Sequence, residues 1–186
     1  MFNQTFVLLI LGALGGLLAA CSSSDARATL KATSGSTIRG LTVTSTAFSD
    51  GGNIPRQYSC QGQGTSPELE WSGAPAGAQS YALIVEDPDA PSGTFIHWVA
   101  YDIPASQTQI SEGAGQVGKS GRNGARQLGY TPPCPPSGTH RYIFNVYALD
   151  VSTLNLPEGA TRDQVTGAMQ GHVFAQGTLT GKYQKQ

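Results

Sequence analysis

Three short runs of β-branched and aromatic residues, each bounded by Pro and Gly clusters, constrain the fold of this chain most. They cover residues 81–87 (YALIVED), 97–103 (HWVAYDI) and 142–149 (YIFNVYAL). Runs of this length and composition between turn-forming residues are typical of strands. Residues 41–46 and 178–183 are weaker examples, and 24 Gly and 11 Pro make turns frequent. We therefore predict a mainly β fold, an antiparallel β-sandwich.

One short helix is expected near the C-terminus. Thr161 and Gln164 have the spacing of a capping box, in which each side chain accepts a free backbone N–H of the first turn. The positions that follow at helical spacing are Val165, Met169, His172 and Gln176. Gly177 would end the helix. His172 would then lie on the buried side of the helix, as a core histidine or as a gate over a pocket mouth.

The N-terminus has the pattern of a secreted protein. The first twenty residues contain no Asp, Glu, Lys or Arg, and they end in Leu18-Ala-Ala before Cys21. The apolar run is short for a bilayer span, and the small residues before a cysteine resemble a bacterial lipobox. We expect a signal peptide over residues 1–20 and a lipid anchor on Cys21. A plain secretory signal and an uncleaved anchor are the alternatives, but neither accounts for the cysteine at the cleavage point.

The rest of the chain divides into a linker and one domain. Residues 21–40 are rich in Ser, Ala and Thr without hydrophobic periodicity, which favours a flexible lipidated tether. Residues 41–186 have a common size for a single domain. The net charge of −1 gives no argument for a nucleic-acid partner. We expect a protein of the bacterial envelope, anchored at the outer membrane because Ser22 rather than Asp follows the cysteine, and no cofactor.

Acylation of Cys21 would leave two cysteines, Cys60 and Cys134. In an oxidising envelope two remaining cysteines usually pair, so we predict a disulfide between them. Two separate buried thiols are the alternative. A zinc site with histidines is less favoured because the chain has no Cys-x-x-Cys spacing, and no metal site is predicted.

Two segments place titratable side chains beside proline-stiffened turns at the ends of predicted strands. The first runs Asp87-Pro-Asp89-Ala-Pro91 and is followed by His97, and the second covers residues 129–142. Strand alternation puts two sets of residues on common faces: Tyr81, Leu83, Val85 and Asp87 on one strand, and His97, Val99 and Tyr101 on the next. If both faces turn inward, Asp87 and His97 form either an interior pair or part of a ligand site.

The order and spacing of these motifs resemble the phosphatidylethanolamine-binding protein family, in its bacterial YbhB/YbcL or Raf kinase inhibitor-like branch. The resemblance extends from about Leu41 to Tyr183. It is carried by residues 58–60, 66–71, 87–91, 97–98, 123, 129–136, 140–142, 147–149, 171–172 and 181–183.

This resemblance implies one β-sandwich domain with a small anion pocket at one end. Carried over to this chain, the ligand-binding residues would be Asp87, His97, Pro136, His140 and Tyr142. Imidazole N–H and phenol O–H groups can donate to phosphate, a phosphorylated head group or a carboxylate. Asp87 would orient a histidine or meet the ammonium of an ethanolamine group, and Asp89 would brace the turn.

The chain departs from the family pattern at two places. Thr131-Pro132 stands where the branch usually has two glycines, and Pro132 removes any N–H contact made there. Arg126 stands where glycine is common, as a cation at the rim of the pocket or as a solvent-exposed side chain.

We predict a binding protein for a small anion, with no catalytic residue. The alternative is a protein-interaction module that inhibits an envelope or host enzyme such as a protease, with a protein partner or a homodimer as its complex. A hydrolase ranks third because no Gly-x-Ser-x-Gly motif occurs, and Ser92, Ser120 and Ser137 show no activating neighbour.

Overall fold

The computed structural model describes residues 39–114 and 116–186. The predicted signal peptide, the lipidation site Cys21 and the tether up to residue 38 lie outside the described residues. Among the residues described, no helix is long and apolar enough to cross a membrane.

Over residues 39–114 and 116–186 the chain forms nine strands and two short helices. The strands are β1 (Arg39–Gly40), β2 (Thr42–Thr44), β3 (Leu69–Ser72), β4 (Ser80–Asp87), β5 (Phe95–Pro104), β6 (Gln109–Ile110), β7 (Lys119–Ser120), β8 (Thr139–Leu149) and β9 (Val173–Gln184). The helices are the 3₁₀ helix η1 (Arg56–Tyr58) and α1 (Arg162–Ala168). The mainly β prediction is confirmed, and β1 occupies two residues that the sequence analysis assigned to the tether.

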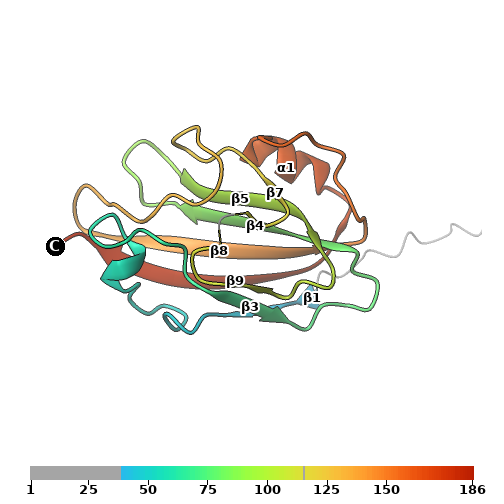
Figure 1. Cartoon of the computed structure of the whole chain (residues 1–186), viewed down its shortest axis with the longest axis horizontal. Helices are drawn as coiled ribbons and strands as arrows, with labels where there is room; N and C mark the ends of the chain where they lie inside the picture. The colour runs from blue at the N-terminus through green and yellow to red at the C-terminus, as the bar shows by residue number, and fades with distance from the viewer. Residues whose placement is uncertain (1–38, 115) are drawn as a thin grey trace, which may run out of the picture. The chain divides into compact units, whose positions relative to one another are not determined.

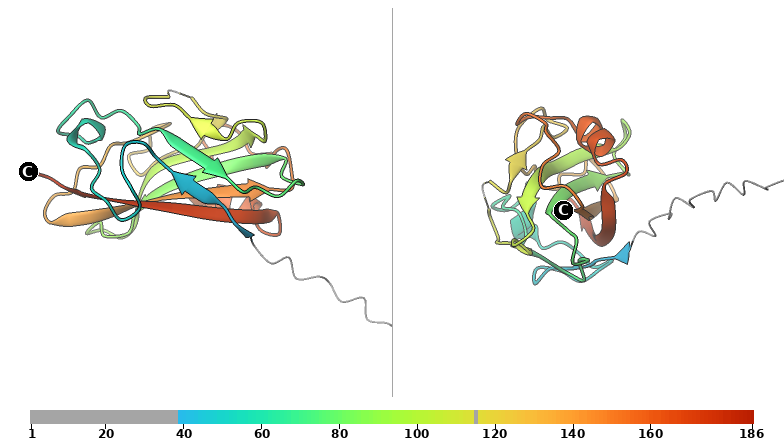
Figure 2. Two further views of the ribbon diagram at one scale, coloured as in Figure 1. Left: turned by 90° about the horizontal axis from the view of Figure 1, so that it is seen from below. Right: turned by 90° about the vertical axis from the view of Figure 1, so that its right-hand side faces the viewer.

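The strands form two sheets. A six-stranded sheet has the order β1-β9-β8-β4-β5-β7, and a three-stranded sheet has the order β2-β3-β6. All pairs are antiparallel except β1 and β9. The large sheet lies between the small sheet and α1, as the separation of β3 and α1 in Figure 1 and the end-on view in Figure 2 show. The predicted antiparallel sandwich is therefore the observed architecture.

Each face of the large sheet covers its own apolar cluster. The cluster between the sheets includes Trp71 of β3, Leu83 of β4 and Phe144 of β8, all nearly inaccessible to solvent. The second cluster lies under α1 and joins Ile84 to Val165. Alternating side chains of β4 thus serve both clusters, and burial of both faces explains why its sequence is almost continuously apolar.

Helix α1 begins as predicted and ends earlier than predicted. The capping box of Thr161 and Gln164 is present, with both side chain to backbone bonds formed. The helix stops at Ala168, and Gln176 and Gly177 belong to β9, so the predicted extension to Gly177 was wrong. Strand pairing with β8 along β9 outweighs the local helical spacing. Gly177 instead lies where the chain crosses closely, because a Cβ there would be 2.5 Å from the Leu41 carbonyl oxygen.

Candidate functional site

A cavity of about 270 Å³ opens where β4 ends and β5 and β8 begin. Its walls are the turn after β4 and the proline-rich loop of residues 131–136. Four of the five residues predicted to bind a ligand line this cavity: Asp87, His97, Pro136 and His140. The two sequence segments therefore meet at one end of the sandwich, as expected.

A β-bulge in β5 brings His97 to this cavity. Val85 pairs with Trp98, whereas the next residue, Glu86, pairs with Ile96, so His97 has no partner in the β4–β5 register. The bulge changes the phase of the strand, because an unpaired residue shifts all alternation beyond it. Val99 packs in the cluster under α1, whereas the His97 ring lies 5.0 Å from Tyr142 of the other cluster. The predicted common face of His97 with Val99 was wrong.

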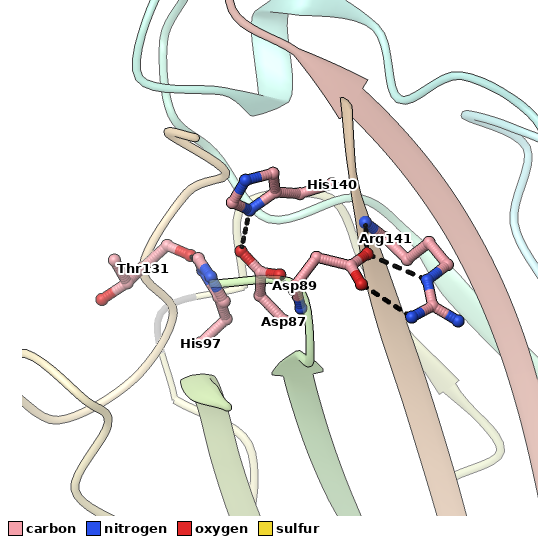
Figure 3. A network of polar contacts seen from close by, with 6 residues as sticks. All are labelled: Asp87, Asp89, His97, Thr131, His140 and Arg141. Carbon is pink, nitrogen blue, oxygen red and sulfur yellow. Dashed lines mark hydrogen bonds and ion pairs between the residues drawn. The ribbon is translucent and has the colours of Figure 1, made fainter. Parts of the chain in front are cut away.

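Asp87 holds His140 in a fixed orientation. The Nδ1 of His140 lies 2.7 Å from Oδ2 of Asp87, and both side chains are buried. The other carboxylate oxygen of Asp87 accepts the backbone N–H of Asp89. Because the carboxylate only accepts, Nδ1 of His140 is the donor, and its second ring nitrogen points away from Asp87 (Figure 3). Asp87 is thus placed to orient a histidine, the first of its two expected roles.

His97 is held by main-chain groups instead of a carboxylate. Its Nδ1 lies 2.7 Å from the carbonyl oxygen of Thr131, and the backbone N–H of Thr131 donates to the carbonyl of His97. A carbonyl only accepts, so Nδ1 of His97 carries a proton. Burial lowers the pKa of His97, although the Thr131 carbonyl and Asp87 act in the opposite direction. The neutral ring therefore presents a lone pair at Nε2.

Tyr142, the fifth predicted residue, lies behind the cavity wall. Its side chain belongs to the core between the sheets and does not line the cavity, and among the residues that the structure describes its hydroxyl has no hydrogen-bond partner of normal geometry. Burial, followed by the nearby Asp87 charge, raises the pKa of Tyr142, so the phenol keeps its proton. In this position the Tyr142 ring packs edge-on against the His97 ring.

Asp89 lies outside the cavity and fastens its turn to β8. Its carboxylate accepts the backbone N–H of Arg141 and two guanidinium N–H groups of the same residue (Figure 3). These side-chain and backbone hydrogen bonds lower the pKa of Asp89 to about 2. The arrangement fits the bracing role expected of Asp89.

The loop opposite the turn has few backbone donors. Four of its six residues, 131–136, are prolines, and the N–H of Thr131 already bonds to His97. A disulfide joins Cys134 to Cys60, and the N–H of Cys60 donates to the carbonyl of Pro133. Asn123 fixes the start of the loop by donating to the Thr131 hydroxyl. Donors for an anion must therefore come mainly from the histidines and from the turn after β4.

Two features of the cavity escaped sequence reasoning. Phe95 packs its ring 4.9 Å from that of His97 and forms part of the wall, but the strand was predicted to begin only at His97. The Thr131 carbonyl sets the tautomer of His97, and no side-chain pattern identifies a main-chain acceptor. The role of Thr131 appears only when the loop is folded.

The described residues hold neither a metal-ligand cluster nor a serine bonded to a histidine. Over residues 39–114 and 116–186, no three His, Cys, Asp or Glu side chains are grouped to hold a metal ion. Ser92 lines the cavity, but in the same ranges no hydrogen bond joins a serine hydroxyl to His97 or His140. The cavity thus combines a few hydrogen-bonding groups, chiefly those of Asp87, His97 and His140, with a largely apolar wall.

His172 lies away from the predicted position. It stands in the turn between α1 and β9, where its Nδ1 is 2.8 Å from Oδ1 of Asp150. Its side chain is 43% exposed, so a buried place on the helix was wrong. It does not line the cavity, and the gate role that was the alternative has no geometric basis.

Comparison with known proteins identifies the relatives of this chain. A family model described as phosphatidylethanolamine-binding protein matches residues 44–184. A UPF0098 protein of Methanothermobacter thermautotrophicus is 46% identical over 145 residues, which cover 75% of this chain and 95% of the relative. A UPF0098 protein of Chlamydia trachomatis is 47% identical over 150 residues, 78% of this chain and 99% of the relative.

Two solved structures share the fold. A phosphatidylethanolamine-binding protein homologue from Chlamydia trachomatis, CT736, superposes with a TM-score of 0.76 at 46% identity, covering 80% of this chain and 99% of the other. YbcL of E. coli, described as a member of the mammalian PEBP family, gives a TM-score of 0.73 at 30% identity, covering 78% of this chain and 99% of the other. The chain therefore belongs to the phosphatidylethanolamine-binding protein family.

Proposed function

We propose that the cavity binds a small oxyanion that carries one protonated oxygen, such as hydrogen phosphate or the phosphomonoester of a head group. The observation that carries this proposal is that both cavity histidines have Nδ1 engaged, His97 by the Thr131 carbonyl and His140 by the Asp87 carboxylate, which leaves Nε2 of each ring for a ligand. Nε2 of neutral His97 accepts a hydrogen bond, and Nε2 of His140 donates one to an anion when that ring carries a second proton.

A phosphomonoester satisfies both histidines at once. Its P–OH group donates to His97, and an ionised oxygen accepts from His140 in a charge-assisted hydrogen bond. A carboxylate ligand such as acetate bonds to His140 alone and leaves the acceptor of His97 without a donor. We therefore expect phosphate and phosphoethanolamine to bind better than acetate or a phosphodiester, because an unmatched buried polar group costs free energy.

We propose binding without turnover. Both Nδ1 atoms are occupied, His97 by a carbonyl and His140 by Asp87, and within residues 39–114 and 116–186 Ser92 forms no hydrogen bond to either ring. Nucleophilic catalysis requires a base within hydrogen-bond reach of the attacking hydroxyl.

Calorimetric titration with inorganic phosphate tests this function. His140→Ala should weaken phosphate binding by about 1.5–3 kcal/mol, the worth of a charge-assisted hydrogen bond. His172→Ala is the matched control, because it removes another imidazole that bonds an aspartate but lies outside the cavity. Equal affinity for acetate and phosphate would contradict the proposed matching of donor and acceptor. Esterase or phosphatase turnover that His140→Ala abolishes would refute a purely binding role.

We also propose that the domain is held at the bacterial envelope through lipid on Cys21. Support comes from the charge-free apolar segment that ends in Leu18-Ala-Ala before this cysteine. Cys21→Ala should move the protein from the detergent phase to the aqueous phase, or leave an unprocessed form, because the several acyl chains would be lost. Unchanged partitioning of a correctly processed Cys21→Ala variant would exclude lipid at this residue.

A further inference from the structure

A second hollow, a groove of about 530 Å³, lies between the loop of residues 121–128 and the start of α1. It shares no lining residue with the cavity at the end of β4, which we call the anion cavity after its proposed ligand. Three arginines line it: Arg122 and Arg126 from the loop, and Arg162 from α1. We call this site the arginine groove.

Backbone contacts fix the floor of the arginine groove. Arg122 donates its N–H to the carbonyl of Ala160 and forms bridges with Leu128 on one side and Thr161 on the other. The loop closes on itself through the buried Asn123, whose side-chain oxygen accepts two backbone N–H groups within the loop. These contacts therefore fix the backbones of the three arginines relative to one another.

The charges in the arginine groove are only partly balanced. Arg162 pairs with Glu86 at 2.9 Å and with Asp163 at 3.1 Å. Over the described ranges, 39–114 and 116–186, neither Arg122 nor Arg126 has a carboxylate within ion-pair distance. Two guanidinium groups are thus free to bind an anion.

An exposed leucine adjoins the cationic surface. Leu128 is 52% exposed, and among the described residues it is the single large hydrophobic side chain with that character. Its Cδ2 and the Nε of Arg122 both lie within 4 Å of the point where a Cβ on Gly159 would stand. The leucine and the arginine are therefore neighbours on one surface.

We propose that the arginine groove docks an acidic, extended peptide segment of a protein partner. Carboxylates of the segment would pair with Arg122 and Arg126, whose planar forks match a carboxylate, and an apolar residue would cover Leu128. Arginine is enriched at protein interfaces, and a partner that pairs with the two arginines would also cover the leucine beside them. The groove has about twice the volume of the anion cavity, which suits several residues of a peptide better than one phosphate.

The backbone of Arg126 provides an independent test of this site. Its φ is 62°, in the left-handed region where glycine is relaxed and other side chains are strained. Arg126→Gly should therefore leave the melting temperature equal or raise it, while it weakens binding of the acidic peptide. If Arg126 served only to support the loop, Arg126→Gly would not weaken peptide binding while leaving the melting temperature equal or higher.

Fluorescence anisotropy with a labelled short peptide that carries several Glu and one Leu tests the proposal directly. Arg122→Gln with Arg126→Gln should weaken binding by about tenfold or more, the effect of losing charge-assisted hydrogen bonds. The matched control is Lys182→Gln with Lys185→Gln, which removes the same charge from the exposed end of the chain at β9. A peptide with Gln in place of Glu should not bind.

Three results would overturn the proposal. The first is equal binding of the Glu and Gln peptides to the wild-type protein. The second is equal weakening in the arginine and lysine double variants, which would indicate net charge alone. The third is binding to phosphatidylglycerol vesicles, but not to the peptide, that depends on Arg122 and Arg126, which would indicate a membrane contact. The anion cavity is not involved in any of these measurements, so His140→Ala should bind the peptide like the wild type.

Discussion

Two histidine–aspartate pairs in this domain have nearly the same geometry in opposite surroundings. His140 and Asp87 are joined at 2.7 Å, with side-chain exposures of 8% and 5%. His172 and Asp150 are joined at 2.8 Å, with exposures of 43% and 32%. The first pair lines the cavity, and the second joins His172, in the turn between α1 and β9, to Asp150, the residue after β8.

Equal distances in unequal surroundings show that burial decides what such a pair does. Water competes for both groups of the exposed pair, so a surface contact of this kind contributes little to stability. In the buried pair each group depends on the other, because loss of one partner leaves a polar group without compensation. The second ring nitrogen of His140 belongs to a ring that lines the cavity, whereas the His172 ring lies outside it.

Removal of the disulfide should lower stability most, and it affects the wall of the cavity that contains the buried pair. Cys60→Ser with Cys134→Ser opens a loop of 74 residues, which should lower the free energy of unfolding by about 4 kcal/mol. Because Cys134 lines the cavity, phosphate binding should weaken as well. Urea titration and calorimetry measure the two effects, and thiol counting of the denatured, non-reduced wild type checks the bond. Two free thiols in envelope-derived protein would contradict the pairing.

Removal of one carboxylate from each pair compares them directly. Asp87→Ala should lower the free energy of unfolding by about 3 kcal/mol, because it also frees the Asp89 N–H and leaves His140 buried without a partner. Asp150→Ala should change it by less than about 1 kcal/mol, the range of exposed ion pairs. Urea unfolding at neutral pH measures both. Similar values for the two variants would show that burial does not separate the pairs.

A smaller effect should come from His97, the cavity histidine that has a carbonyl in place of a carboxylate. Burial holds its folded-state pKa below the ordinary value of 6.5. As pH falls below 6.5, the unfolded chain binds a proton at this position first, so stability decreases toward acid, by at most ~1.4 kcal/mol per pH unit. The difference in unfolding free energy between pH 7.5 and pH 5.5 should therefore shrink in His97→Gln. An unchanged difference would mean that His97 titrates alike in both states.

Local patterns predicted much of this domain. Turn-bounded apolar runs located β4, β5 and β8, and the Thr161–Gln164 pair located the start of α1. The two polar segments were expected at strand ends and do meet there. These signals are readable because turns, caps and alternation depend on residues a few positions apart.

Long-range pairing decided the rest. The bulge that turns His97 toward Asp87 arises from the register between β4 and β5, which alternation within one strand does not contain. Pairing with β8 drew Gln176 and Gly177 into a strand and left His172 in an exposed turn. The Thr131 carbonyl that fixes the tautomer of His97 belongs to a loop held by a disulfide and by Asn123. The sequence by itself determined which groups lie at the cavity end of the sandwich. The tertiary structure decided which of them donate, which accept and which lie behind the cavity wall. The reason is that strand register and burial are set by contacts between distant segments.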